Sequence, residues 1–148
     1  MNNTEFISVL IVESQTLMLT ALSAALSTEG IAVLGEVKDS RQAIRSVAQF
    51  NPQVLVFSIG TPSLPDLERI DAIRHESPNV LILALIDEDF RGQERMAQGY
   101  GAHRVLTKSA SRAELISAIQ DLVRKNISTR ATLHRKERRT HRELDQNG

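Results

Sequence analysis

Short apolar runs alternate with segments of helical periodicity along the chain. Five of the runs are almost continuously aliphatic, as expected for strands that are buried on both faces of a sheet. They are Ile7–Val12, Ile31–Val37, Val54–Phe57, Val80–Leu85 and Arg104–Leu106. Strands separated by helices are typical of a parallel sheet with helices on both sides, so the pattern predicts an α/β fold with five βα units.

The segments between the strands carry helix boundary signals. Helices are expected at residues 15–29, 41–50, from 66 onward, at 90–100 and from 112 onward. Gly30 is placed to end the first helix and Ser40 to cap the second, because glycine favours the C-terminal boundary and serine the N-terminal one. Ser111 and Glu114 form a capping box at the start of the fifth helix.

The connections between these elements restrict the topology. Right-handed crossovers and short loops favour the flavodoxin-like strand order 2-1-3-4-5, a doubly wound sheet in three layers. In that order a ligand pocket forms where the first and third strands end. The residues expected there are Glu13 and Ser14 after the first strand and Ser58 after the third.

Composition limits the class of protein. The 148 residues suit one domain with an aliphatic core, since only 3% are aromatic. The chain has no cysteine, which agrees with a reducing compartment and excludes disulfides and thiolate metal sites. No segment approaches the roughly 18 apolar residues of a membrane helix, and the N-terminus lacks a signal peptide pattern. A cytoplasmic protein without membrane contact is expected.

The net charge of zero hides an uneven distribution. Residues 126–148 carry six basic and three acidic side chains, which leaves +3 there and −3 on residues 1–125. Because this segment has almost no apolar stripe, we expect a domain at 1–125 followed by a flexible basic extension at 126–148. The extension could contact nucleic acid, but only weakly.

Three sequence segments carry a family resemblance. They are ISVLIVES at residues 7–14, VLVFSIGTPSLPD at 54–66 and GAHRVLTKSAS at 101–111. In this order and at these spacings they make residues 7–125 resemble bacterial response-regulator receiver domains, above all those that precede LuxR-type DNA-binding modules. The resemblance implies the flavodoxin-like fold and a role in two-component signal transduction or a phosphorelay.

The resemblance also shows what this chain lacks. In the family an acidic pair follows the first strand and a phosphoacceptor aspartate ends the third; here Glu13 and Ser14 replace the pair and Ser58 replaces the acceptor. Lys108 keeps the family's lysine at the end of the fifth strand. One carboxylate is a poor Mg²⁺ site and an unactivated serine is a poor nucleophile, so we expect weak or absent Mg²⁺ binding and no aspartyl phosphorylation.

The family's switch positions differ as well. The resemblance puts Ile86 where the family has threonine or serine, and Val105 where it has an aromatic residue. Neither can support the phosphate-driven rearrangement of the family. Lys108 is expected to pair with Glu13, since a partly buried charge without a partner is costly; the alternative is that it extends into water.

Other polar residues have simpler explanations. His75 and His103 lack further ligands at metal-binding spacing and are interpreted as surface residues. The acidic residues 87–89 are attributed to the start of a helix, where the helix dipole favours negative charge.

The sequence therefore favours an atypical, non-enzymatic receiver that binds protein partners independently of phosphorylation. We also expect a homodimer, for which Leu17, Ile116 and Val123 are the candidate contact residues. The alternative is the receiver portion of a truncated LuxR-type transcription regulator, because residues 140–144 (THREL) resemble the start of such a DNA-binding module. In that case residues 126–148 would be a linker or a DNA-contacting tail.

Overall fold

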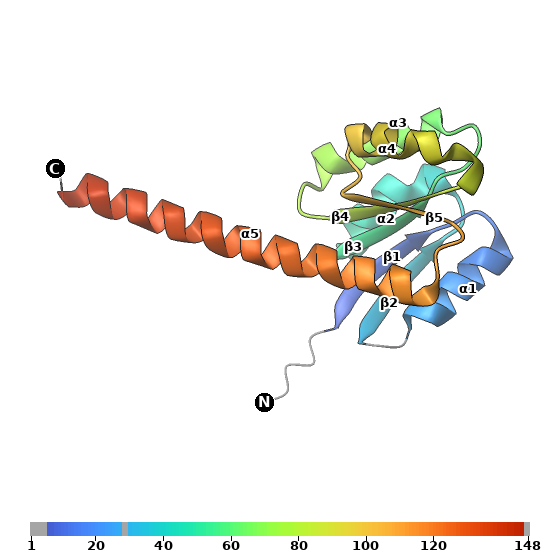
Figure 1. Ribbon diagram of the computed structural model, residues 1–148, viewed down its shortest axis with the longest axis horizontal. Helices are drawn as coiled ribbons and strands as arrows, with labels where there is room; N and C mark the ends of the chain where they lie inside the picture. The colour runs from blue at the N-terminus through green and yellow to red at the C-terminus, as the bar shows by residue number, and fades with distance from the viewer. Residues whose placement is uncertain (1–5, 28–29, 147–148) are drawn as a thin grey trace.

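A computed structural model of the chain (Figure 1) describes residues 6–27 and 30–146, with the backbone alone at residue 91 and at residues 140–146. The elements are β1 (Ile7–Val12), α1 (Thr16–Leu26), β2 (Ile31–Val37), α2 (Ala43–Phe50), β3 (Val54–Ser58), α3 (Leu64–Glu76), β4 (Leu81–Ile86), α4 (Glu94–Tyr100), β5 (Arg104–Thr107) and α5 (Arg112–Gln146). Short 3-10 helices, η1 (Ser40–Gln42) and η2 (Glu88–Gln93), precede α2 and α4. The five predicted strands are thus confirmed to within one residue at each end.

The strands form one parallel sheet in the order β2-β1-β3-β4-β5, which confirms the predicted flavodoxin-like fold. Helices α1 and α5 cover one face of the sheet, and α2, α3 and α4 cover the other (Figure 1). Each face has its own hydrophobic cluster, so the three layers are joined through the sheet.

The central strands β3 and β4 are buried along their whole length, whereas the edge strands β2 and β5 are partly exposed. Their side chains alternate between the two clusters because successive residues of a strand point to opposite faces. Each buried leucine, isoleucine or valine contributes about 1.5–3 kcal/mol to folding. The continuous apolar runs of the sequence thus become the centre of the molecule.

Several predicted helix boundaries are wrong, among them the start of the fourth helix, which was expected at Phe90 and lies at Glu94. Helix α1 ends at Leu26 with Ser27 as its C-cap, and Gly30, at φ 77°, precedes β2 instead of closing the helix. Ser40 does not cap the second helix, because α2 begins at Ala43 with Gln42 as its N-cap. The 3-10 helix η1 comes before it, and the Asp39 carboxylate caps η1 by accepting the backbone N–H of Arg41 at 3.0 Å. The aspartate also holds the Arg41 side chain, which a serine hydroxyl would do less well.

Helix α5 begins as predicted and extends further than expected. The Ser111 hydroxyl accepts the backbone N–H of Glu114 at 3.1 Å, which confirms the N-terminal cap. The helix then continues without a break to Gln146, so no change of secondary structure marks residue 125. The flexibility of the 126–148 segment and the domain boundary in front of it stay predictions. Within the described part of the chain, none of the helices is long and apolar enough to cross a membrane.

His103 is not the surface residue that the sequence suggested. The backbone N–H of Ile82 donates to His103 Nδ1 at 2.9 Å, so the ring connects the start of β5 to the start of β4. Partial burial, and secondarily the nearby Arg74 guanidinium, lower the His103 pKa below its ordinary value of 6.5. His75, by contrast, is exposed at the end of α3 as predicted.

The lowered pKa of His103 predicts that stability falls in mild acid. The unfolded chain takes up a proton on this ring near pH 6.5 whereas the folded chain resists it, so stability present at pH 7.5 is lost as the pH falls below 6.5. Urea unfolding at pH 7.5 and 5.5 measures the loss. His103→Asn, whose Oδ1 can accept the same N–H, should reduce it, and His75→Asn should not. An equal loss in wild type and His103→Asn would contradict the assignment.

Candidate functional site

The carboxyl ends of β1 and β3 lie side by side, as the predicted topology requires. Val12 is paired with Phe57 in the sheet, so Glu13 and Ser58 follow at adjacent positions. Beside them is a hollow of about 260 Å³. It is lined by Val12, Ser14, Ser40, Ser58, Gly60, Thr61, Pro62, Pro65, Asp66 and Arg69. The structure thus brings Ser14 and Ser58 into one pocket.

Glu13 and Ser58 are both buried, with exposed fractions of 2% and 6%. One carboxylate oxygen of Glu13, Oε1, accepts the backbone N–H of Gln15 at 2.9 Å. The other oxygen, Oε2, and the Ser58 hydroxyl have no hydrogen-bond partner among the described residues. A buried polar atom without a partner costs about 1–3 kcal/mol, so a hydrogen bond from a bound ligand or from solvent would stabilise these two atoms.

Lys108 does not pair with Glu13, and that prediction is wrong. Its Nζ donates to the backbone carbonyl of Ile59 at 2.9 Å and lies 3.4 Å from the Asp87 carboxylate. Asp87, which the sequence attributed only to the start of a helix, is therefore the partner of the lysine. Its position directly after β4, the strand paired with β5, explains the choice, because Lys108 directly follows β5.

The two positions that the sequence matched to the switch residues of the family, Ile86 and Val105, are filled by aliphatic side chains. Ile86 is 2% exposed in the cluster under α2, α3 and α4, and Val105 packs against the same cluster. Ile86 has no hydroxyl with which to bind a ligand oxygen, and Val105 is too short to rearrange as an aromatic ring would. Both residues therefore serve the core in this structure.

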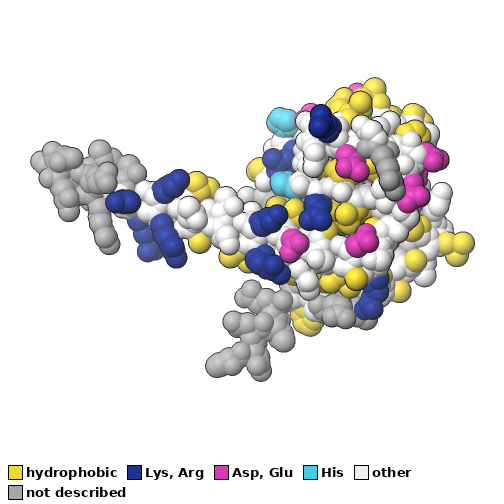
Figure 2. Space-filling model, in the orientation of Figure 1, with side chains coloured by type: hydrophobic (Ala, Val, Ile, Leu, Met, Phe, Trp, Pro, Cys, Tyr) yellow, Lys and Arg dark blue, Asp and Glu magenta, His cyan; other side chains and the backbone are white. Residues whose placement is uncertain are grey.

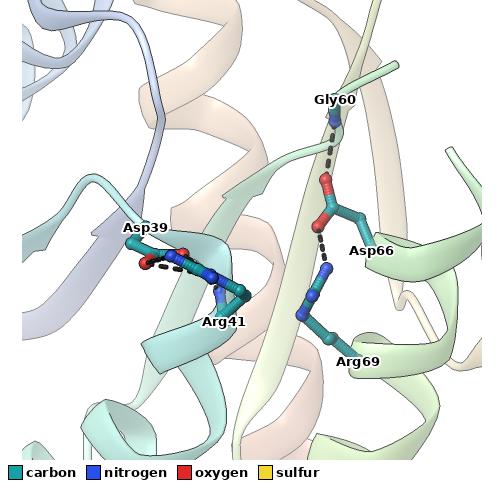
Figure 3. A network of polar contacts seen from close by, with 5 residues as sticks. All are labelled: Asp39, Arg41, Gly60, Asp66 and Arg69. Atoms are coloured by element: carbon teal, nitrogen blue, oxygen red, sulfur yellow. Dashed lines mark hydrogen bonds and ion pairs between the residues drawn. The ribbon is translucent and has the colours of Figure 1, made fainter. Parts of the chain in front are cut away.

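Asp66 is a site residue that the sequence reasoning missed. It is buried at the start of α3, where Oδ2 accepts the backbone N–H of Gly60 at 2.8 Å and Oδ1 accepts from Arg69 at 2.9 Å (Figure 3). Asp66 thus brings a carboxylate to the hollow, from α3 instead of β3. An acidic residue in the first turn after a proline was the available signal, but that pattern also fits a helix start alone.

A second ion pair lies near the first. Figure 3 shows Asp39 and Arg41, from the segment between β2 and α2, opposite Asp66 and Arg69. Hydrogen bonds from the side chain and the backbone of Arg41, with a smaller contribution from the Arg69 charge, lower the pKa of Asp39 to about 2. Asp66 and Arg69, which line the hollow, have opposite charges, so its walls carry little net charge.

The donor atoms present do not fit the Mg²⁺ that the resemblance implies. Mg²⁺ is held in proteins by one or two carboxylates that are open to the ion. Of the two buried carboxylates in the described part of the molecule, Glu13 has one oxygen uncommitted and Asp66 has both engaged. Among the described side chains, no three histidines or acids gather in a way that could hold a metal.

Comparison with known proteins agrees with this architecture. The response regulator receiver domain family matches residues 9–120. The transcriptional regulatory protein MctR of Rhizobium johnstonii is 30% identical over 115 residues, which cover 77% of this chain and 54% of that protein. The response regulator GacA of Pseudomonas viridiflava is 25% identical over 116 residues, with the same two shares.

A solved structure shows the same fold. The signal receiver domain of a NarL response regulator from Mycobacterium tuberculosis superposes with a TM-score of 0.72 at 24% identity, covering 79% of this chain and 95% of that one. The chain spans about half the length of the two curated regulators it matches. Strand order, site position and the match over residues 9–120 lead to one conclusion: the chain belongs to the response regulator receiver domain family.

Proposed function

We propose that this receiver domain is a phosphorylation-independent protein-interaction module in signal transduction and not an enzyme. The observation that carries the proposal is Ser58, a buried hydroxyl with no partner, at the end of β3. A serine becomes a nucleophile only when a base accepts its proton. The Ser58 hydroxyl makes no hydrogen bond to Glu13, to Lys108 or to any other described residue.

The position of Lys108 supports a fixed conformation. By contacting both Ile59 and Asp87, its ammonium group joins the segments that follow β3, β4 and β5. The Ser109 hydroxyl adds a hydrogen bond to Glu88 in the same region. We infer that these segments at the carboxyl end of the sheet keep one conformation without a bound phosphoryl group. The surface that they form is then always available to a protein partner.

Exposed apolar side chains provide a surface for a protein partner. Leu17 near the start of α1 is 87% exposed, and Leu64 at the start of α3 is 51% exposed. Both are on helices that begin at the carboxyl end of the sheet. Because α1 and α3 lie on opposite faces of the sheet, the two leucines offer two separate contact points for a partner and not one continuous patch.

The homodimer stays a prediction, and its three candidate contact residues differ in exposure. Ile116 and Val123 are only partly exposed because both pack against the cluster under α1 and α5. Leu17 is therefore the predicted contact residue that is most open to a second molecule. We propose that the dimer uses the α1–α5 side of the domain.

A second candidate function follows from the lengths of the relatives. Both MctR and GacA, a transcriptional regulatory protein and a response regulator, are about twice as long as the matched region. The chain would then be the receiver portion of a LuxR-type transcription regulator, with residues 126–148 as linker. A protein partner found in a pull-down with the 148-residue chain supports the first function; sequence-specific duplex binding that survives moderate salt supports the second.

The absence of a working acceptor predicts inertness to phosphodonors. Incubation with acetyl phosphate and Mg²⁺ should leave the intact mass unchanged, because Ser58 is not activated and Asp66 is held by Gly60 and Arg69. The Ser14→Asp/Ser58→Asp variant is the positive control, since it adds two carboxylates beside Glu13. A phosphoryl adduct on the wild-type chain that disappears in Ser58→Ala or Asp66→Asn would disprove the proposal.

The proposed dimer predicts a specific effect of Leu17. Leu17→Glu should weaken self-association at least about tenfold, roughly 1.4 kcal/mol, because it introduces a charge into an apolar contact. Met96→Glu is the matched control, since Met96 is also exposed but lies on α4 in the opposite layer. Light scattering over a concentration series gives the mass. A mass of 16.4 kDa at every concentration would exclude the dimer, and equal effects of the two variants would exclude the α1–α5 side.

A further inference from the structure

The second half of α5 projects from the domain as a single helix. Figure 1 shows the α/β body at one end of the molecule and α5 running away from it. Arg130 is in contact with the body, because its Nη2 donates to Asn79 Oδ1 at 3.1 Å in the segment between α3 and β4. Residues 131–139 that follow are all exposed. We refer to residues 131–139 as the arm.

The arm has a basic side. It contains Arg135, Lys136, Arg138 and Arg139 and a single acid, Glu137, for a net charge of +3. At about 100° per residue the four basic positions lie on one side of the helix, and Glu137 lies on the opposite side. Figure 2 shows the Lys and Arg side chains gathered along the projecting helix, whereas acidic side chains are seen over the body.

The apolar content of the arm argues against two kinds of partner. Leu133, 54% exposed, is its only large apolar residue, so the side opposite the arginines cannot bury an apolar face in a lipid surface. Pairing with the same helix of a second copy would need apolar residues at regular spacing and would bring like charges together. Charge complementarity therefore favours a polyanion.

We propose that the basic side of the arm binds the phosphate backbone of duplex DNA. A helix of about 10–12 Å diameter fits the roughly 12 Å wide major groove, whose walls carry phosphates on both sides. The arm has no Phe, Tyr or Trp on which unpaired bases could stack, which favours a duplex over a single strand. No base-reading contact is implied, so the binding is independent of sequence. This inference goes beyond the proposed function and does not depend on it.

The number of charges fixes the expected salt dependence. Lys136 and Arg139 have other contacts, which they would exchange for a phosphate. If each of the four basic side chains then neutralises one phosphate, the slope of log affinity against log salt is about −3.6. Between 50 and 200 mM salt the affinity should then fall about 100-fold. This dependence distinguishes backbone binding from a contact that rests on apolar surface.

Fluorescence anisotropy of a labelled 20-base-pair DNA duplex with the full 148-residue chain tests the proposal. The variant with Arg135, Lys136, Arg138 and Arg139 all changed to Gln should lose at least about 100-fold in affinity at 50 mM salt, with a slope near zero. The matched control, Arg45→Gln/Arg95→Gln, removes two exposed charges from α2 and α4 of the body and should bind within about threefold of wild type. All three proteins should show equal unfolding midpoints, since the changed side chains are exposed.

Three outcomes would overturn the proposal. The first is no duplex binding by the wild-type chain at 50 mM salt, and the second is an equal loss in the arm variant and the body control. The third is tighter binding to vesicles that contain phosphatidylserine than to the duplex, which would indicate a lipid partner. None of these outcomes bears on phosphoryl transfer or on the protein partner, so a failure here leaves the proposed function separately testable.

Discussion

The burial of β3 and β4 on both faces is the constraint on which the rest of the structure depends. Because these strands are apolar throughout, polar side chains can occur only where they end. Ser58 and Asp87 take those two positions, one at the last residue of β3 and one directly after β4. The covering helices, the two clusters and the hollow beside Ser58 follow from this central pair. The site is thus a product of the sheet and not of its loops alone.

The sequence predicted the strands and their order because long aliphatic runs have few alternative structures. The partners of charged side chains were predicted less well. Lys108 was predicted to pair with Glu13 because Glu13 was the nearest carboxylate in the expected pocket. In the structure the lysine instead contacts the backbone carbonyl of Ile59 and the Asp87 carboxylate. A sequence does not show which backbone carbonyls will lie near a lysine. Asp66 and Asp39 were missed for a related reason. Each is a common residue at a helix start, and only the fold shows that an arginine holds each of them and that Asp66 lines the hollow.

The polar site beside Ser58 also affects the stability of the fold. Glu13 Oε2 and the Ser58 hydroxyl are buried without partners in the described structure, and each such atom works against folding. Proteins keep features of this kind where an earlier or present function requires them. The surrounding hydrophobic clusters, which contain no polar side chains, offset the loss. The hydrophobic clusters and the polar site are therefore separated in space, the clusters inside the layers and the site at the carboxyl ends of the strands.

The hydrogen bond between Arg130 and Asn79 attaches α5 to the body at one point, and the helix residues after Arg130 extend beyond that point. Sixteen residues follow Arg130 in the described helix, a length of about 24 Å. A rotation of α5 by about 10° about the Arg130–Asn79 contact displaces the far end of the helix by about 4 Å. The atoms near Asn79 move by only a fraction of that distance. Small events on the body, such as the docking of a partner beside α3, would thus be magnified into a movement large enough for a second molecule to detect.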